Sequence, residues 1–398
     1  MKRTILCLGL IFCCLSTAIS GETIVSQELL SYKRLFIKAS LSDKTSLLRD
    51  AAGKTSVDMG SLFIDALQFA IESRPVLGGD PELIQLTVQG LSFVNTYNPQ
   101  EHLPLLWQVF EVFPEVQVRV LVMESLGAIA AAASSGTDEI VSRLNTFLLE
   151  QASPGRADDS VVLAVVNTLG KFNDSTSFIP LFRVVSGNRS SSVRDAAAAV
   201  LNTITENYAK NIISLIRTES LPGKLAAFRL SEKNTAISDI LKGEIAETAL
   251  KTAIDISETS QEGEQRKMLR HLRREAVLDI TEVRWSRASP QVIRYIYMTQ
   301  TDYKNNLVDA DALIEVIDCL SVMGTQEAAQ TLSIYLGLLN SDTEETGSYN
   351  ETVVLAVINA LGALGDKIAF DYLLYVSYLS YSETVIAASR DAMGRLTW

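Results

Sequence analysis

The sequence predicts an all-α protein, an α-solenoid in which antiparallel helix pairs stack along the chain. Three observations predict this fold. Apolar residues recur at helical spacing, which is typical of helices with one buried face. Proline is scarce, at nine of 398 residues, so long helices are easily accommodated. Finally, a multi-helix block occurs twice in the chain, which is the signature of a repeat architecture.

The N-terminus has the pattern of a secretory signal peptide. Lys2 and Arg3 precede an apolar run over residues 4–15, and small residues at Ala18 and Ser20 favour cleavage before Gly21. The run is short for a membrane span, which needs about 20 residues. We therefore expect residues 1–20 to be a cleaved signal and the protein to be exported, with the bacterial periplasm the favoured compartment.

A retained anchor or a lipidated cysteine, Cys13 or Cys14, is the alternative at this end, although bulky Phe12 makes a poor lipidation motif. A membrane is expected as a partner only in those cases. Cleavage would leave Cys319 as the single cysteine, which excludes an intramolecular disulfide. The formal net charge is −12, and loss of the segment makes it more negative by two. Such a chain repels nucleic acid in general, so no nucleic-acid partner is expected.

Residues 21–115 are expected to form an N-terminal helical region. Predicted helices cover the ranges Glu22–Ala39, Asp58–Ser73, Pro81–Tyr97 and Pro99–Val112. Asp80-Pro81 and Asn98-Pro99 are helix start signals, in which a capping residue precedes proline in the first turn.

Two blocks, residues 116–208 and 306–398, are related by duplication. Residues 161–204 align without a gap to residues 353–396, and 15 of the 44 positions are identical. Weaker similarity extends the copies upstream, to about 116–205 and 310–398. Chance would give only a few identities, so duplication of a multi-helix block is the simplest account.

Each copy is expected to contain helix, tight turn and helix. In the first, Gly170 is expected to end a helix and Asp174 to cap the next one, and Asp366 repeats the cap. Polar loops are expected at Ala152–Asp159 and Ser341–Asn350. The leucines on the apolar stripes are the predicted repeat core: Leu126, Leu169, Leu181, Leu201, Leu320, Leu361 and Leu373.

Between the blocks, residues 209–305 break the period. They are helical in pattern, and they are either divergent repeats or an insertion between two arrays. Ser257–Glu264 is the most linker-like stretch, since it is rich in serine, threonine and glutamate around one glycine.

A family resemblance is carried by Val161–Gly170, Asp174, Leu181 and Val193–Leu201, the last with the run Val-Arg-Asp-Ala-Ala. This succession resembles HEAT repeats of the phycobilin-lyase type. The second copy departs from it, with Ile386-Ala387 in place of Arg-Asp. The resemblance implies a right-handed α-solenoid with two helix layers, and it covers about half of the chain.

Candidates for catalysis are few. The two histidines, His102 and His271, are far apart, and neither is followed by glutamate as in the iron-binding His-Glu pairs of one HEAT-repeat enzyme class. Cys319 lies in an apolar helix and is expected to be a buried thiol. Gly53-Lys54-Thr55 lacks the first glycine and the preceding strand of a phosphate-binding loop. No catalytic residue, metal or cofactor is therefore predicted.

A basic cluster stands out in this acidic chain: Arg266, Lys267, Arg270, Arg273 and Arg274. Four of these arginines share one side of a helix, which is a candidate site for an anion or an acidic partner. The alternative is a solvated helix that pairs with acids elsewhere in the array. Tyr372, Tyr375 and Tyr378 also follow helical spacing, and exposed tyrosines would suit peptide binding.

Three functions are compatible with the sequence. The favoured one is a non-catalytic scaffold of the bacterial cell envelope, which binds another protein or an envelope component through a solenoid surface. The second is an enzyme or enzyme accessory related to HEAT-type lyases, which attach chromophores to partner proteins. The third is a structural subunit of an envelope assembly. The sequence leaves the oligomeric state open.

Overall fold

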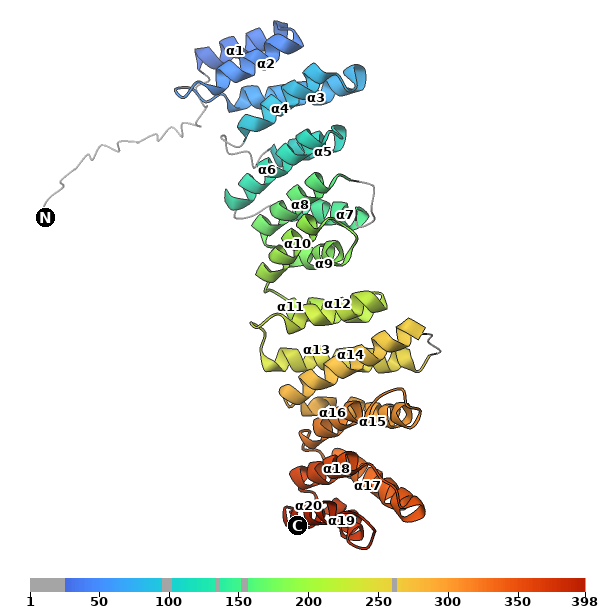
Figure 1. The fold of residues 1–398 in the computed structure, drawn as a ribbon. Coiled ribbons are helices and arrows are strands. Elements are labelled where there is room, and N and C mark those ends of the chain that lie inside the picture. Colours follow the sequence, from blue (N-terminus) through green and yellow to red (C-terminus); the bar gives the residue numbers. More distant parts are fainter. Residues whose placement is uncertain (1–25, 95–101, 133–136, 152–156, 260–262, 398) are drawn as a thin grey trace, which may run out of the picture. The chain divides into compact units, whose positions relative to one another are not determined.

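The computed structural model describes residues 26–94, 102–132, 137–151, 157–259 and 263–397, so the predicted signal segment lies outside the described residues. The described chain is a succession of α-helices joined by turns and short loops (Figure 1). The helices are α1 (Gln27–Lys38), α2 (Leu41–Ala52), α3 (Gly60–Leu77), α4 (Pro81–Val94), α5 (Leu103–Val112), α6 (Val116–Ala132), α7 (Asp138–Glu150), α8 (Asp159–Phe172), α9 (Phe178–Ser186), α10 (Ser191–Thr203), α11 (Tyr208–Thr218), α12 (Leu221–Glu232), α13 (Asp239–Ser257), α14 (Gly263–Glu282), α15 (Ser289–Lys304), α16 (Ala310–Ser321), α17 (Gln326–Thr346), α18 (Glu351–Leu364), α19 (Phe370–Val376) and α20 (Glu383–Gly394).

The chain divides into two compact units, Met1–Ser135 and Gly136–Trp398, which we call unit 1 and unit 2. In unit 1, α1 pairs with α2, α3 with α4 and α5 with α6. The odd-numbered helices pack on one another in one layer, and the even-numbered helices do the same in a second layer. Unit 1 is therefore a two-layered stack of helix pairs.

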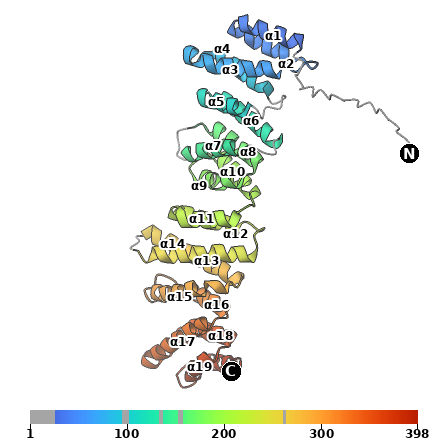
Figure 2. The same cartoon turned by 180° about the vertical axis from the view of Figure 1, so that it is seen from behind.

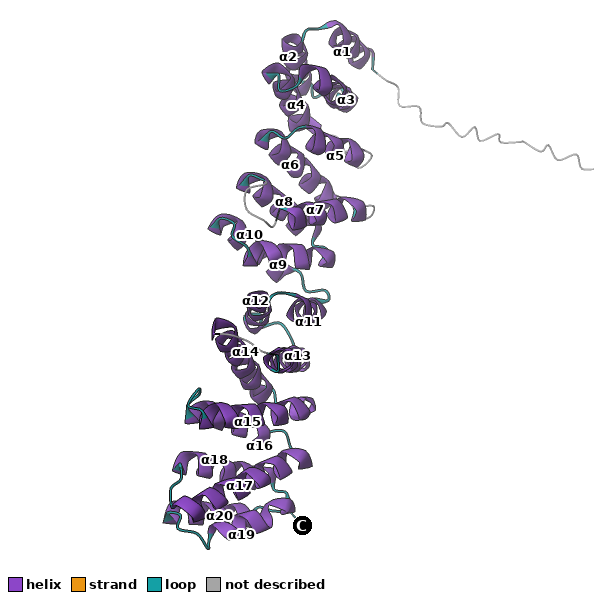
Figure 3. Ribbon diagram, turned by 90° about the vertical axis from the view of Figure 1, so that its right-hand side faces the viewer, coloured by secondary structure: helices purple, strands orange, loops and turns teal. Residues whose placement is uncertain are grey.

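Unit 2 follows the same rule over a longer stretch. Its odd-numbered helices, α7 to α19, pack on one another in order and form what we call layer A. We call its even-numbered helices, α8 to α20, layer B; α8 packs on α10, α12 to α20 pack in order, and α12 contacts α9 of layer A. The pairs follow one another in chain order in both views (Figures 1 and 2). Figure 3 shows α11 and α13 in one column and α12 and α14 in the other. The expectation of an all-α solenoid of helix pairs is confirmed.

The middle segment, residues 209–305, continues these layers. It supplies nearly all of α11 and the whole of α12 to α15, and these helices pack within the same stack. The expected boundary after residue 305 falls between α15 and α16, which pack as a pair, and the one after residue 115 falls between α5 and α6, which do the same. Residues 257–264 join α13 to α14, and these two helices pack closely on each other, so the stretch lies within one helix pair.

The duplicated block is visible as a repeated order of elements. Helix α8, the 3₁₀ turn η2 (Ser175–Ser177), α9 and α10 recur as α18, η4 (Lys367–Ala369), α19 and α20. Each element of the second copy begins 192 residues after its counterpart in the first. The predicted caps are present in both copies. The Asp174 carboxylate accepts from the Thr176 amide at 2.7 Å, and the Asp366 carboxylate accepts from the Ile368 amide at 2.9 Å.

Gly170 has a different role from the one predicted. Helix α8 continues through it to Phe172 and ends at Asn173, whose φ of 50° gives the left-handed cap. A Cβ at Gly170 would lie 2.8 Å from Cγ2 of Val200 in α10. The glycine therefore permits close packing of two layer B helices and does not form a turn.

The equivalent glycine of the second copy, Gly362, approaches Ala392 in the same way. A Cβ there would lie 3.0 Å from the alanine Cβ. All seven predicted core leucines are fully buried in the structure: Leu126, Leu169, Leu181, Leu201, Leu320, Leu361 and Leu373.

The polar stretch from Ser341 is not the loop that was expected, since α17 runs on to Thr346. This end of α17 is stabilised by Tyr381, which lies between α19 and α20. The Tyr381 hydroxyl donates to the Asn340 side chain at 3.1 Å and accepts from the Thr343 hydroxyl at 3.0 Å. Buried hydrogen bonds across repeats thus extend a helix that its composition disfavours.

In unit 1, α2 was not predicted. Its sequence is polar, but Ser40 accepts from the Asp43 amide at 3.2 Å and caps the helix. Leu48 and Ala51 are fully buried on its inner side. Gly53, the first residue of the rejected phosphate-loop match, is the C-cap of this helix.

Candidate functional site

The five predicted partner-binding residues all lie on α14, but they do not form one surface. Arg266, Lys267 and Arg274 are exposed and Arg270 is half-buried, whereas only 3% of Arg273 is exposed. The expectation that Arg273 shares an outward side with its neighbours is therefore wrong. Position 273 lies four residues after Leu269 and three before Ala276, within the buried stripe of the helix.

Two exposed members of the cluster, Lys267 and Arg274, are bound to acids. Arg274 makes a bidentate pair with Glu315 of α16, at 2.5 and 2.6 Å, and Lys267 pairs with Glu264 at 2.8 Å. Exposed ion pairs of this kind contribute little stability. They do, however, pair basic side chains that were candidates for binding a partner. This agrees with the alternative interpretation, a solvated helix whose basic residues pair with acids of the same chain.

Arg273 and Arg266 nevertheless line a pocket of about 460 Å³ in unit 2. Three neighbouring helices supply its walls: the C-terminal end of α13, the N-terminal half of α14 and the C-terminal half of α15. The lining residues are Ser257, Glu258, Thr259, Arg266, Leu269, Arg273, Met298, Asp302 and Leu307.

The Arg273 guanidinium is poorly satisfied inside this pocket. Its Nη2 lies 3.7 Å from an Asp302 carboxylate oxygen, which is beyond hydrogen-bond length, and its Nη1 donates to the Met298 sulfur at 3.5 Å. Its Nε is buried and has no hydrogen-bond partner. The guanidinium carbon lies 5.2 Å from the centre of the Tyr295 ring. Burial lowers the pKa of Arg273, while Tyr295 and Asp302 raise it.

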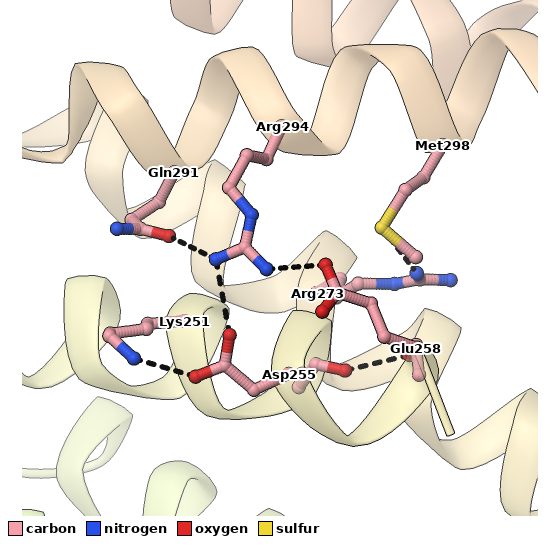
Figure 4. Close-up of polar contacts among 9 residues, drawn as sticks. Lys251, Asp255, Glu258, Arg273, Gln291, Arg294 and Met298 are labelled. Atoms are coloured by element: carbon pink, nitrogen blue, oxygen red, sulfur yellow. Dashed lines mark hydrogen bonds and ion pairs between the residues drawn. The ribbon is translucent and has the colours of Figure 1, made fainter.

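The acids around the pocket are already neutralised in part. Figure 4 shows Arg294 of α15 reaching across to α13, where it binds Glu258 at 2.5 Å and Asp255 at 3.1 Å. Lys251 also binds Asp255, at 2.6 Å. Asp302 is thus the acid that faces Arg273, and it does so at long range.

Hydroxyl groups on the α13 side donate elsewhere. Ser257 donates to the Ala253 carbonyl at 2.7 Å, and Thr259 donates to the Ile256 carbonyl at 2.6 Å. Leu269 and Met298 supply apolar wall, and Leu307 adds an apolar side chain that is 46% exposed. The pocket therefore combines an under-bonded buried cation with an apolar wall, an arrangement typical of small-ligand sites.

Cys319 and the two histidines are the other candidate reactive side chains in the described part of the chain. Cys319 is fully buried, and burial raises the pKa of its thiol to about 12, so it is held as the neutral thiol. His271 is exposed and lies 2.9 Å from a Glu275 oxygen. His102 immediately precedes α5. Within the described residues, no three His, Cys, Asp or Glu side chains are grouped so as to hold a metal ion.

None of the described helices combines the length and the apolar character that a membrane crossing requires.

Apolar side chains are exposed unevenly on the two layers of unit 2. Among its described helices, layer A exposes seven large apolar residues and layer B exposes one, Leu278. The seven are Leu149, Ile240, Leu241, Tyr297, Ile334, Leu338 and Tyr375. We call these seven the layer A apolar set.

The set is densest toward the C-terminal end of unit 2. Tyr297, Leu338 and Tyr375 lie on the consecutive layer A helices α15, α17 and α19. Tyr378, just after α19, is 73% exposed, and its ring centre lies 6.4 Å from that of Tyr375. Of the predicted tyrosine series, Tyr372 alone is half-buried.

The sequence matches no protein-family model, and a search of curated proteins finds no match to it.

Proposed function

We propose that this protein is a non-catalytic, protein-binding scaffold of HEAT type, and that layer A of unit 2 is its binding face. The observation that carries the proposal is the unequal exposure of apolar side chains on the two layers. Exposed apolar residues on one face are typical of interaction sites, and tyrosine is enriched where binding energy concentrates.

The solenoid arrangement supports the same proposal. Stacked helix pairs bury a continuous core while presenting long surfaces, and Tyr297, Leu338 and Tyr375 recur on neighbouring layer A helices. The HEAT assignment depends on the sequence pattern, and the matching order of elements in the two copies supports it. Export to a bacterial envelope is proposed from the N-terminal segment alone.

The test compares two exposed leucines on opposite layers. Leu338 on layer A is 50% exposed, and Leu278 on layer B is 45% exposed. Because both are exposed, Leu338→Asp and Leu278→Asp are each expected to change folding stability by only about 0.5 kcal/mol. Wild type and both variants are used to capture partners from the source organism, and the captured protein is then purified and titrated against each.

We expect Leu338→Asp to weaken binding of the purified partner at least about tenfold, since a central contact is worth more than 1 kcal/mol, and Leu278→Asp to leave it unchanged. Equal binding by the two variants would refute the assignment of layer A. If the captured partner is a second copy of this chain, the scaffold proposal gives way to a structural subunit of an assembly, which sedimentation at several concentrations would show directly.

A further inference from the structure

We propose that the pocket between α13, α14 and α15 binds a monoanionic carboxylate through the buried guanidinium of Arg273. The site is separate from the layer A apolar set. The inference therefore does not depend on the proposed function, and either can fail alone.

The first step of the argument is the unmet bonding capacity of Arg273. A guanidinium carries five N–H donors, and its burial is costly unless partners satisfy them. Here the Nε donor has no partner, Nη1 meets only a thioether sulfur, and Nη2 lies 3.7 Å from Asp302. An anion in the pocket would accept from the terminal nitrogens of Arg273, to which the protein offers only a thioether sulfur and a distant carboxylate.

The second step is charge. Arg266 and Arg273 line the pocket together with Glu258 and Asp302. Glu258 is bound by Arg294 at 2.5 Å, and Arg294 also binds Asp255, which Lys251 binds as well. Asp302 is therefore the pocket carboxylate that faces Arg273, and it lies beyond hydrogen-bond length, so a monoanion beside Arg273 would add a single negative charge. A phosphate dianion would meet stronger repulsion from the two carboxylates.

The third step is the shape and lining of the cavity. Planar carboxylates match the fork of an arginine and accept two parallel hydrogen bonds. Leu269, Met298 and Leu307 provide apolar contacts for whatever carries the carboxylate. The pocket volume of about 460 Å³ lies within the range of small-molecule sites and exceeds a single side chain. The ligand is therefore a carboxylate on an apolar body, either a free organic acid or the acidic end of a peptide.

The test uses the full chain and three defined probes at pH 7.5 and fixed low salt. Sodium hexanoate is the carboxylate, hexanamide is its neutral analogue, and inorganic phosphate is the competing anion. Binding is followed by ligand-observed NMR titration. We expect hexanoate to bind at least about tenfold more tightly than hexanamide, because a charge-assisted bond to a guanidinium is worth that factor or more. We also expect it to bind more tightly than phosphate.

Three variants locate the binding. Arg273→Met keeps the side-chain bulk while removing the charge, and should lose the preference for hexanoate over hexanamide. Arg274→Met removes the same charge from the next residue, which binds Glu315 and does not line the pocket, and should bind hexanoate as wild type does. Asp302→Asn removes the internal competitor for Arg273 and should strengthen hexanoate binding several-fold.

If Arg273→Met fails to fold, Asp302→Asn still tests the proposal. If the pair of Arg273 and Asp302 were purely structural, removing the charge of Asp302 would not tighten anion binding. The proposal is overturned if hexanoate and hexanamide bind equally, if Arg273→Met retains the preference, or if Asp302→Asn weakens binding. Tighter binding of phosphate than of hexanoate would overturn the choice of carboxylate. A peptide with a free C-terminal carboxylate, tested against its amidated form, distinguishes the two sources of the ligand.

Discussion

Close packing of α18 on α20 at Gly362 predicts that a single added methyl group destabilises the C-terminal repeat. In Gly362→Ala the new Cβ would lie 3.0 Å from the Ala392 Cβ and 3.1 Å from the Ala392 Cα. The Cα belongs to the backbone, so no change of rotamer relieves the contact. The two helices must move apart, which loosens the layer B packing around a buried position.

The expected change in the free energy of unfolding is the difference between two opposing effects. Replacing glycine by alanine within a helix stabilises it by roughly 1 kcal/mol when there is room. Overpacking a well-packed site costs roughly 1–3 kcal/mol. Because the contact here involves backbone, we expect the upper part of that range and a net destabilisation of about 1–2 kcal/mol. Gly394→Ala, at the end of α20, is the matched control, since nothing lies within 4 Å of its added Cβ.

Native-state hydrogen exchange of the α18 and α20 amides measures the local free energy of opening, because repeat arrays open in segments. Urea unfolding followed by circular dichroism gives the global value. Gly394→Ala should be neutral or stabilising by up to about 1 kcal/mol. If the α18 and α20 amides are equally protected against hydrogen exchange in Gly362→Ala and in Gly394→Ala, the reasoning is refuted. Combining Gly362→Ala with Ala392→Gly should recover part of the loss, and a purely additive double mutant would show that the two positions are not in contact.

Three further predictions concern other parts of unit 2. Leu169→Ala and Leu361→Ala should each cost roughly 2–5 kcal/mol in urea unfolding, since both side chains are fully buried, and near-zero effects would show that the repeat register is wrong. Tyr381→Phe should cost about 1–3 kcal/mol in the same assay by leaving the buried Asn340 oxygen without its donor, and an unchanged unfolding midpoint would contradict this. Burial and the nearby Glu282 charge raise the pKa of Asp279 to about 6, so the folded state binds this proton more tightly than the unfolded chain and loses stability as pH rises from about 4 to about 6. Asp279→Asn should therefore match wild type near pH 4 and exceed it by about 1–2 kcal/mol near pH 7.5, and a difference that stays constant across this range would exclude the titration of Asp279 as its cause.

The repeat itself could be read from the sequence because its signals are local. The gap-free match of residues 161–204 to 353–396 predicts two equal blocks, and the structure repeats the order of elements at the same offset. Asp174 caps its turn through an amide two residues away, which sequence spacing captures directly. The core leucines follow from helical periodicity for the same reason.

Features that depend on a neighbouring repeat could not be read in this way. Gly170 has the composition of a turn, but its contact with Val200 on another helix makes it a packing residue. The polar end of α17 stays helical because Asn340 and Thr343 bond to Tyr381, about forty residues further on. The middle segment breaks the sequence period but contributes helices to both layers, because layer packing requires only apolar faces of suitable volume.

The basic cluster and the pocket show the same difference between local sequence signals and tertiary contacts. The sequence by itself determined that five cations gather on one predicted helix of an acidic chain, and it left open whether this helix belongs to the stack of helix pairs. Only the tertiary structure decided that Arg274 is bound by Glu315 while Arg273 is buried beside an apolar cavity. The physical reason is that burial and pairing of these side chains depend on contacts with α13, α15 and α16, and helical periodicity within α14 does not predict contacts between helices.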